Sequence, residues 1–358
     1  MRCRARALAI ATLVGLAGGC GQWQRTGAQP HPRPAAAVPG LSDARAIYRA
    51  MGLVVGSPPL AFVASLHFLA DASPDSTLAV FGLSLANRVL SFHQSGKEFV
   101  AQYHVELTFR SNGLTVRQVA RDETVRLHSF QETLRSEESI IFQQFLAVRP
   151  GTYLVRVAVR DRTGPAYSEQ EVVDTVPRLG AGSLGGPIPI YQGAGRNDLG
   201  TLPDIVVNPR ATVPYGTDTL RFYVEGYGLP AGTRVASRLA DPTGVELWRD
   251  TLPLAGDAEL SRAEFVVTGE LPVGRAEIQV AAVGVPSALA QGPLLVGLSD
   301  QWAIANFEEM VTLFRYFDRQ DLVAKLRAAP RYQRAATWRE FYRASDPVPL
   351  TPENEAID

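Results

Sequence analysis

The chain has 358 residues, of which 46% are hydrophobic and 20% are charged, so it can build sizeable hydrophobic cores, and its length favours two or three domains over one. This composition excludes a disordered, collagen-like or coiled-coil chain. The formal net charge is −1, and removal of Arg2, Arg4 and Arg6 with a leader would leave 32 of the 35 basic residues against 36 acidic ones, a net charge of −4, which argues against nucleic acid as a partner.

Residues 1–19 have the layout of a secretory signal. Three arginines precede the apolar run from Ala7 to Ala17, and Gly18-Gly19-Cys20 follows. The run is too short to cross a bilayer, which takes ~20 residues. Small residues before a cysteine resemble the lipobox of bacterial lipoproteins, in which the cysteine carries the lipid, although Ala17 stands where leucine is usual. Cys20 is therefore the predicted lipidation site, and ordinary cleavage near Ala28 is the alternative.

The segment after the leader is expected to be a tether. Cys3 and Cys20 are the only cysteines, so the folded part can hold neither a disulfide nor a thiolate metal site. Residues 20–40 are rich in proline and lack periodicity, which predicts a partly extended chain. Residues 41–59 form a lead-in with a short helix at Ser42 to Met51.

Residues 60–177 alternate apolar and polar side chains with a period of two. Tyr103, Val105 and Leu107, for example, share one face of a strand and polar residues occupy the other. Ser111-Asn112-Gly113 then supplies a hairpin turn.

The same order of strands and turns recurs in residues 202–297, with a turn at Asp241 to Gly244 and a strand that carries Ile278 and Val280. Strands with turn signals every 8 to 12 residues are typical of β-sandwiches. The predicted fold is mainly β, with two tandem antiparallel β-sandwich (Ig-like) domains followed by a short helical connector, and Val157 and Ile278 are expected in separate cores.

Residues 178–201 are rich in glycine and are expected to form an interdomain linker. Gly180 to Gly185 spells the G-x-G-x-x-G motif of dinucleotide-binding proteins, which needs a helix to begin at the glycines. Pro187 and Pro189 exclude that helix. No cofactor site is therefore expected here.

A loop in the same segment offers the only candidate ligand residues. Tyr191, Arg196, Asn197 and Asp198 combine an aromatic ring with groups that could bind a sugar or calcium. Asparagine and aspartate are also common turn residues.

No catalytic or metal-binding pattern is present in the sequence. None of the five histidines lies two or four residues from another, and there is no G-x-S-x-G, H-E-x-x-H or P-loop motif. We therefore expect a non-catalytic protein with no bound metal or cofactor. The alternative is a glycan-binding or hydrolytic protein with its site near the loop 191–200.

The period changes from two to between three and four in residues 298–345. Ile304, Phe307, Phe314 and neighbouring apolar residues predict an amphipathic helix, and two shorter helices are expected at Asp321 to Ala328 and Tyr332 to Ala344. Aromatic stripes at helical spacing are mostly core, so Phe307, Phe314 and Trp338 are assigned to packing. Residues 346–358 form a tail with helix-starting residues at Thr351.

The end of the chain resembles the stretch that leads into the GWxTD module of bacterial envelope proteins. Trp338, Phe341-Tyr342, Asp346-Pro347, Thr351 and Asn354-Glu355 follow the order found in that family. The Gly-Trp-x-Thr-Asp segment itself is absent, so we expect either a truncated chain or a diverged relative, and the helix start favours truncation. The resemblance implies an envelope lipoprotein with β-sandwich domains and implies no reaction.

The leader and this resemblance together predict a location and a mode of action. The protein is expected in the bacterial cell envelope, anchored by Cys20 in a membrane, with the outer membrane as the first choice. Its expected partners are the membrane and other envelope proteins, which it would contact through its sandwich domains without catalysis.

Overall fold

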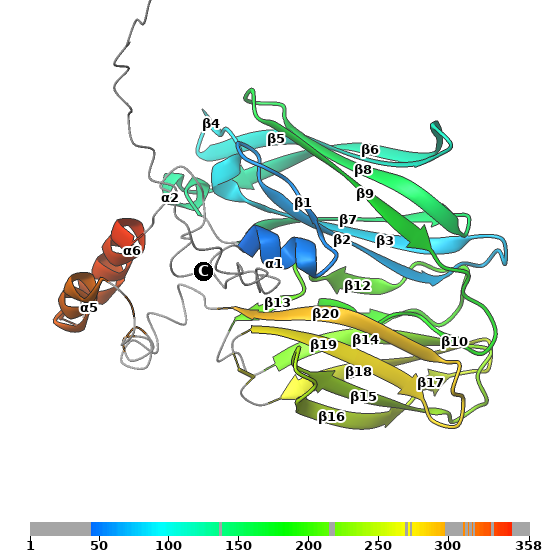
Figure 1. Ribbon diagram of the computed structural model, residues 1–358. Coiled ribbons are helices and arrows are strands. Elements are labelled where there is room, and N and C mark those ends of the chain that lie inside the picture. The colour runs from blue at the N-terminus through cyan, green and yellow to red at the C-terminus, as the bar shows by residue number, and fades with distance from the viewer. Residues whose placement is uncertain are drawn as a thin grey trace, which may run out of the picture. The chain divides into compact units, whose positions relative to one another are not determined.

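The computed structural model describes residues 44–135, 138–214, 219–268, 271–272, 274–297, 311, 314, 317, 319–330 and 333–345. Predictions about the leader, Cys20, the tether, most of the first connector helix with Phe307, and the tail at 346–358 lie outside these residues. Within them the fold is mainly β, as predicted, with two sandwiches in succession (Figure 1).

The first sandwich consists of two sheets. Sheet A has the order β1 (Val54–Val55), β2 (Phe62–Ala70), β3 (Thr77–Ala86), β7 (Glu138–Val148). Sheet B has the order β4 (His93–Ser95), β5 (Glu98–Ser111), β8 (Gly151–Asp161), β9 (Tyr167–Val176), with β6 (Leu114–Leu127) also paired to β5. All of these pairings are antiparallel.

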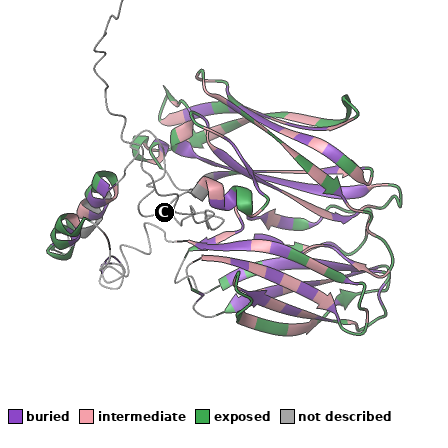
Figure 2. Cartoon of the chain, in the orientation of Figure 1, coloured by how far each residue is buried: buried purple, intermediate pink, exposed green. Residues whose placement is uncertain are grey.

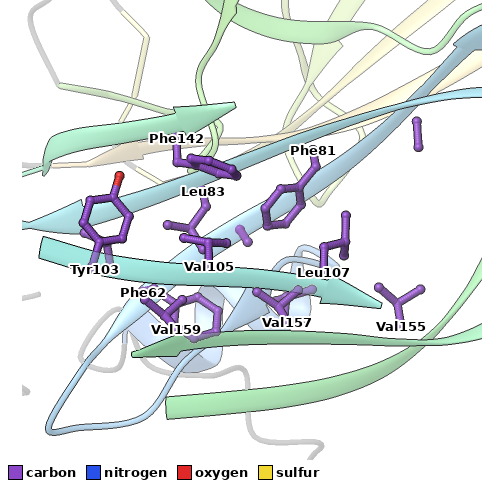
Figure 3. Close-up of a cluster of buried hydrophobic side chains, with 14 of the residues drawn as sticks. Phe62, Phe81, Leu83, Tyr103, Val105, Leu107, Phe142, Val155, Val157 and Val159 are labelled. Carbon is purple, nitrogen blue, oxygen red and sulfur yellow. The ribbon is translucent and has the colours of Figure 1, made fainter. Parts of the chain in front are cut away.

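The predicted alternation places the core between sheets A and B. Tyr103, Val105 and Leu107 of β5 are buried and face Phe81 and Leu83 of β3 (Figure 3). Residues between them on β5 are more exposed. Because successive side chains of a strand point to opposite faces, one buried face per sheet is sufficient to build this core.

The second sandwich also has two sheets. Sheet C has the order β12 (Asp204–Val207), β11 (Ile188–Gly195), β14 (Thr219–Tyr227), β18 (Leu260–Thr268), β17 (Ala255–Gly256), with β10 (Ser183–Leu184) also paired to β14. Sheet D has the order β13 (Thr212–Pro214), β20 (Leu289–Gly297), β19 (Gly274–Ala282), β15 (Arg234–Ala240), β16 (Glu246–Pro253). The pairing of β13 with β20 is parallel, the one exception among the pairings described.

The second core is mainly aliphatic, with an aromatic group from sheets C and D within it. Phe222 and Phe265 stack with ring centroids 5.0 Å apart, and Trp248 meets both rings edge-on. Val157 and Ile278 are fully buried in different clusters, the first between sheets A and B and the second between sheets C and D. The prediction of separate cores is confirmed.

Residues 178–201, expected as a linker, instead contribute β10 and β11 to sheet C. Ile188 and Ile190 are buried there against Leu69 and Val80, which lie on the outer face of sheet A. Gly195 has a φ of +74°, and a Cβ at this position would lie 2.5 Å from the ring of Tyr223. Glycine is therefore required by a positive φ and a close approach rather than by flexibility.

The described helices are short. They comprise α1 (Ala44–Ala50), α2 (Phe130–Thr133), α5 (Gln320–Arg327) and α6 (Arg334–Ser345), together with the 3₁₀ turn η1 (Asn87–Val89). Phe314, Trp338 and Phe341 are buried together in a cluster, as expected for a packed stripe. Figure 2 colours the chain by burial and shows long buried stretches along the strands of both sandwiches. No helix among the described residues combines the length and the apolar character needed to cross a membrane.

Candidate functional site

A cleft of about 760 Å³ is lined by strand edges of both sandwiches. Its walls include residues 66–68 of β2, 170–174 of β9, 289–293 of β20, and residues 49, 51–55 and 186–187. Ligand sites commonly have volumes of about 300 to 1,000 Å³ and lie at domain interfaces. This cleft is therefore the candidate functional site.

The β2 wall of the cleft is a strand edge that is only partly paired. β1 pairs with Val63 and Ala64 alone, although β2 has nine residues. In an antiparallel strand the N–H and C=O of one residue point to the same side, and successive residues alternate. Gly56 donates its N–H to the carbonyl of Phe62 on this side. Even-numbered residues of β2 therefore direct their backbone groups away from β3.

The far end of this edge is occupied by side chains of the second sandwich. The N–H of Ala70 donates to the hydroxyl of Tyr227 at 3.0 Å, and the Nη2 of Arg196 donates to the carbonyl of Ala70 at 2.6 Å. Between the two occupied ends, Leu66 and Phe68 direct their N–H and C=O groups to the cleft. No strand of the described chain pairs with them on that side.

The β9 wall of the cleft carries an incompletely paired carboxylate. β9 is an edge strand that pairs only with β8 among the described strands. Asp174 is half-buried, and its Oδ1 accepts the N–H of Thr175 at 2.7 Å. Burial raises the pKa of Asp174, which the hydrogen bond from Thr175 partly offsets. No salt bridge joins Asp174 to any residue that the structure describes.

His67 lies on the opposite side of β2 from Leu66 and Phe68. His67 as a whole is half-buried, but its Nε2 atom is fully buried and has no hydrogen-bond partner among the described residues. Burial lowers the pKa of His67 to about 4, so the imidazole is neutral at pH 7. Because Nε2 is enclosed, we assign no ligand contact to this atom.

The loop predicted as a ligand site is instead bonded internally at Arg196. The guanidinium is buried and pairs with both oxygens of Glu225, from Nε at 2.9 Å and from Nη2 at 2.8 Å. It also donates to the carbonyls of Leu199, Thr201 and Ala70. Its donors are thus used within the protein, and Arg196 joins the two sandwiches rather than facing a ligand.

The other predicted loop residues do not converge on a site. The Oδ1 of Asn197 accepts from Arg262 at 2.5 Å, and Asp198 accepts from the hydroxyl of Thr201. Tyr191 lies on β11 with 41% of its surface exposed. None of the four predicted residues lines the cleft.

Sequence reasoning missed the partner of Arg196. Tyr223 and Tyr227 each donate a hydroxyl to Glu225 at 2.7 Å, so the carboxylate accepts four hydrogen bonds. Burial and then the charge of Glu225 raise the pKa of Tyr227 well above its ordinary value, which keeps this donor protonated. A sequence signal did exist: the three residues share one face of a strand, which sets an acid between two tyrosines.

Comparisons with known proteins identify no family. No family model and no curated protein sequence matches the chain. A crystal structure of red sea bream transglutaminase aligns over 71% of this chain and 33% of that one, with 11% identity and a TM-score of 0.20. Trypsin-activated alpha-2-macroglobulin from Escherichia coli aligns over 66% of this chain and 17% of that one, with 13% identity and a TM-score of 0.23. The chain therefore spans about a third or less of these proteins, and similarity at these scores carries no argument about activity.

The described residues also contain no group of three or more histidine, cysteine, aspartate or glutamate side chains placed to hold a metal ion. The chemistry that the cleft does offer is hydrogen bonding from an open strand edge, one half-buried carboxylate and apolar contact.

Proposed function

We propose that this chain is a lipid-anchored protein of the bacterial cell envelope that acts by binding other envelope proteins rather than by catalysis. The observation that carries the proposal is the leader, in which three arginines and an apolar run end at Gly18-Gly19-Cys20. The resemblance of the segment around Trp338 to GWxTD proteins supports the same location.

A binding role agrees with the chemistry of the cleft. An open stretch of strand edge beside apolar and charged side chains is a common way to bind another polypeptide. The candidate ligand loop gives less support to a glycan-binding or hydrolytic role, because Arg196 is saturated by internal hydrogen bonds.

Replacing the predicted lipidation site tests the anchor. The Cys20→Ala variant should leave the membrane fraction, whereas the parent chain should stay with membranes and show the added mass of acyl chains. Each buried methylene of an acyl chain contributes ~0.8 kcal/mol to membrane binding, and more than one chain makes the anchor stable. Cys3→Ala is the matched control because it removes the other cysteine from the same leader. Equal membrane retention of all three proteins, with no lipid mass on the parent, would refute the anchor.

A further inference from the structure

The edge of β2 contains a gap of two residues within an otherwise occupied row of backbone groups. On the side away from β3, the row begins with Phe62 and Ala64, which Gly56 and β1 occupy, and ends with Ala70, which the second sandwich occupies. No described residue bonds to the backbone of Leu66 or Phe68 on this side, and both residues line the cleft. Four hydrogen-bonding groups of the backbone are therefore available in one short stretch.

We propose that this gap binds an extended segment of a partner polypeptide, which adds to β2 as a short strand and places a lysine or arginine side chain beside Asp174. The inference rests on the proposed function, because it names the kind of partner that a non-catalytic envelope protein contacts. A strand rises about 3.3 Å per residue, so a segment of three or four residues spans the distance from Leu66 to Phe68.

The direction of the strands places Asp174 opposite this gap. Ser57, next to the start of β2, donates its N–H to the hydroxyl of Ser168 near the start of β9. Thr77, which pairs with Ala70, donates its hydroxyl to the carbonyl of Pro177 just beyond the end of β9. β2 and β9 thus run in the same sense, and residue 174 falls level with the second half of β2.

Charge and apolar surface in the cleft both favour a basic, partly apolar segment. The β9 wall contributes Asp174, which has no ion-pair partner among the described residues, whereas Arg49 is the one arginine or lysine among the lining residues. Glu171 also lines the cleft, but it already pairs with Arg110 at 3.9 Å. At the rim, Leu289 is 62% exposed and offers apolar surface to a bound segment. A bound strand with one basic residue beside an apolar residue would pair Asp174 and cover Leu289.

Amide hydrogen exchange on the full chain tests the strand addition directly. In the free protein the amides of Leu66 and Phe68 should exchange faster than those of Ala64 and Ala70, which have partners. The probe is a pool of short peptides with a central lysine and randomised flanking positions. At saturating peptide, the amides of Leu66 and Phe68 should become protected at least tenfold, while Asn112 in the β5–β6 hairpin turn should not change.

A matched pair of variants tests the charge. Asp174→Asn should weaken binding of the lysine pool about tenfold or more, as expected for loss of a hydrogen bond to a charged group. Asp250→Asn is the control, since Asp250 lies on the edge strand β16 and accepts the N–H of the next threonine at 2.7 Å, as Asp174 does. The control should bind like the parent, and a pool with a central glutamate should bind more weakly than the lysine pool.

The proposal is overturned if the lysine pool fails to bind at about 1 mM, if binding leaves the two amides unprotected, or if Asp174→Asn binds as the parent does. These results would leave the membrane anchor intact, because the peptide assay uses purified protein and needs no membrane. Conversely, if the Cys20→Ala experiment refutes the membrane anchor, the expected peptide binding is unchanged.

Discussion

Removal of the negative partner from the buried pair of Arg196 and Glu225 should strongly destabilise the fold, and Glu225→Gln tests this. Glu225 has no exposed surface, and its side chain accepts two hydrogen bonds from Arg196 and one each from Tyr223 and Tyr227. The glutamine amide keeps the size of the side chain but replaces one acceptor oxygen with a donor group. It therefore opposes a donor of Arg196 and removes the negative charge that compensates the guanidinium.

The expected loss in the free energy of unfolding is ~3 to 5 kcal/mol, the usual cost of breaking a buried ion pair by removing one partner. A domain has only about 5 to 15 kcal/mol of net stability, so the variant should be severely destabilised. Urea unfolding followed by tryptophan fluorescence measures the loss as a lower midpoint with little change in slope.

Glu264→Gln is the matched control for this experiment. Glu264 pairs with Arg221 on the adjacent strands β18 and β14, but both side chains are substantially exposed, at 30% and 42%. Exposed pairs contribute ~0 to 1 kcal/mol, so this variant should unfold almost as the parent does. If Glu225→Gln loses no more than Glu264→Gln, the assigned role of the buried pair is refuted.

Three other predictions concern stability. Val157→Ala and Ile278→Ala should each destabilise the chain, by ~2 to 5 kcal/mol for the isoleucine and somewhat less for the valine. The two losses, measured by urea unfolding, should add because the cores are separate. A large coupling energy in the double variant would contradict this. Gly195→Ala should lower the free energy of unfolding by more than ~1 kcal/mol, because of the positive φ of Gly195 and the nearby tyrosine ring. Gly200→Ala should be nearly neutral, because the nearest atom to its added Cβ is a side-chain oxygen at 3.3 Å. Similar thermal midpoints for the two variants would count against the close approach. The pKa of His67 is about 4 in the folded chain and 6.5 in the reference state, so between these pH values the unfolded chain binds more protons than the folded chain. The free energy of unfolding should therefore fall as the pH is lowered through this range, by up to about 3 kcal/mol. If His67→Gln shows the same pH dependence as the parent, the burial of the imidazole has been misassigned.

Local patterns in the sequence were sufficient to predict the two sandwiches. The alternation in β5 is long, and its turn at Asn112 and Gly113 uses residues that tolerate positive φ, at +50° and +78°. Both signals lie within a short stretch of sequence, so they can be recognised without knowing which residues pack against them. The strand β11 was missed because only Ile188 and Ile190 alternate before the glycines begin, and the reason for Gly195 is a tyrosine on another strand.

The sites depended on contacts between distant residues. Arg196 looked available in the sequence because its partner is 29 positions away on β14. The gap at Leu66 and Phe68 exists because β1 is two residues long and because Tyr227 reaches Ala70 from 157 positions away. Propensity and periodicity do not encode the length of a neighbouring strand or the reach of a side chain, so the gap could not be predicted, and the alternation of Tyr223, Glu225 and Tyr227 could indicate a buried acid but not its pairing with Arg196.

The apolar contact between sheets A and C has a consequence for how the chain is made. The strands of the first sandwich are all synthesised by Val176, but Leu69 and Val80 on its outer face are covered by β11 and β12, which follow later in the chain. During synthesis, the first sandwich therefore has an uncovered apolar face until these strands are made, a state that favours aggregation. A chaperone that holds the emerging chain until residue 207 has passed would remove that hazard.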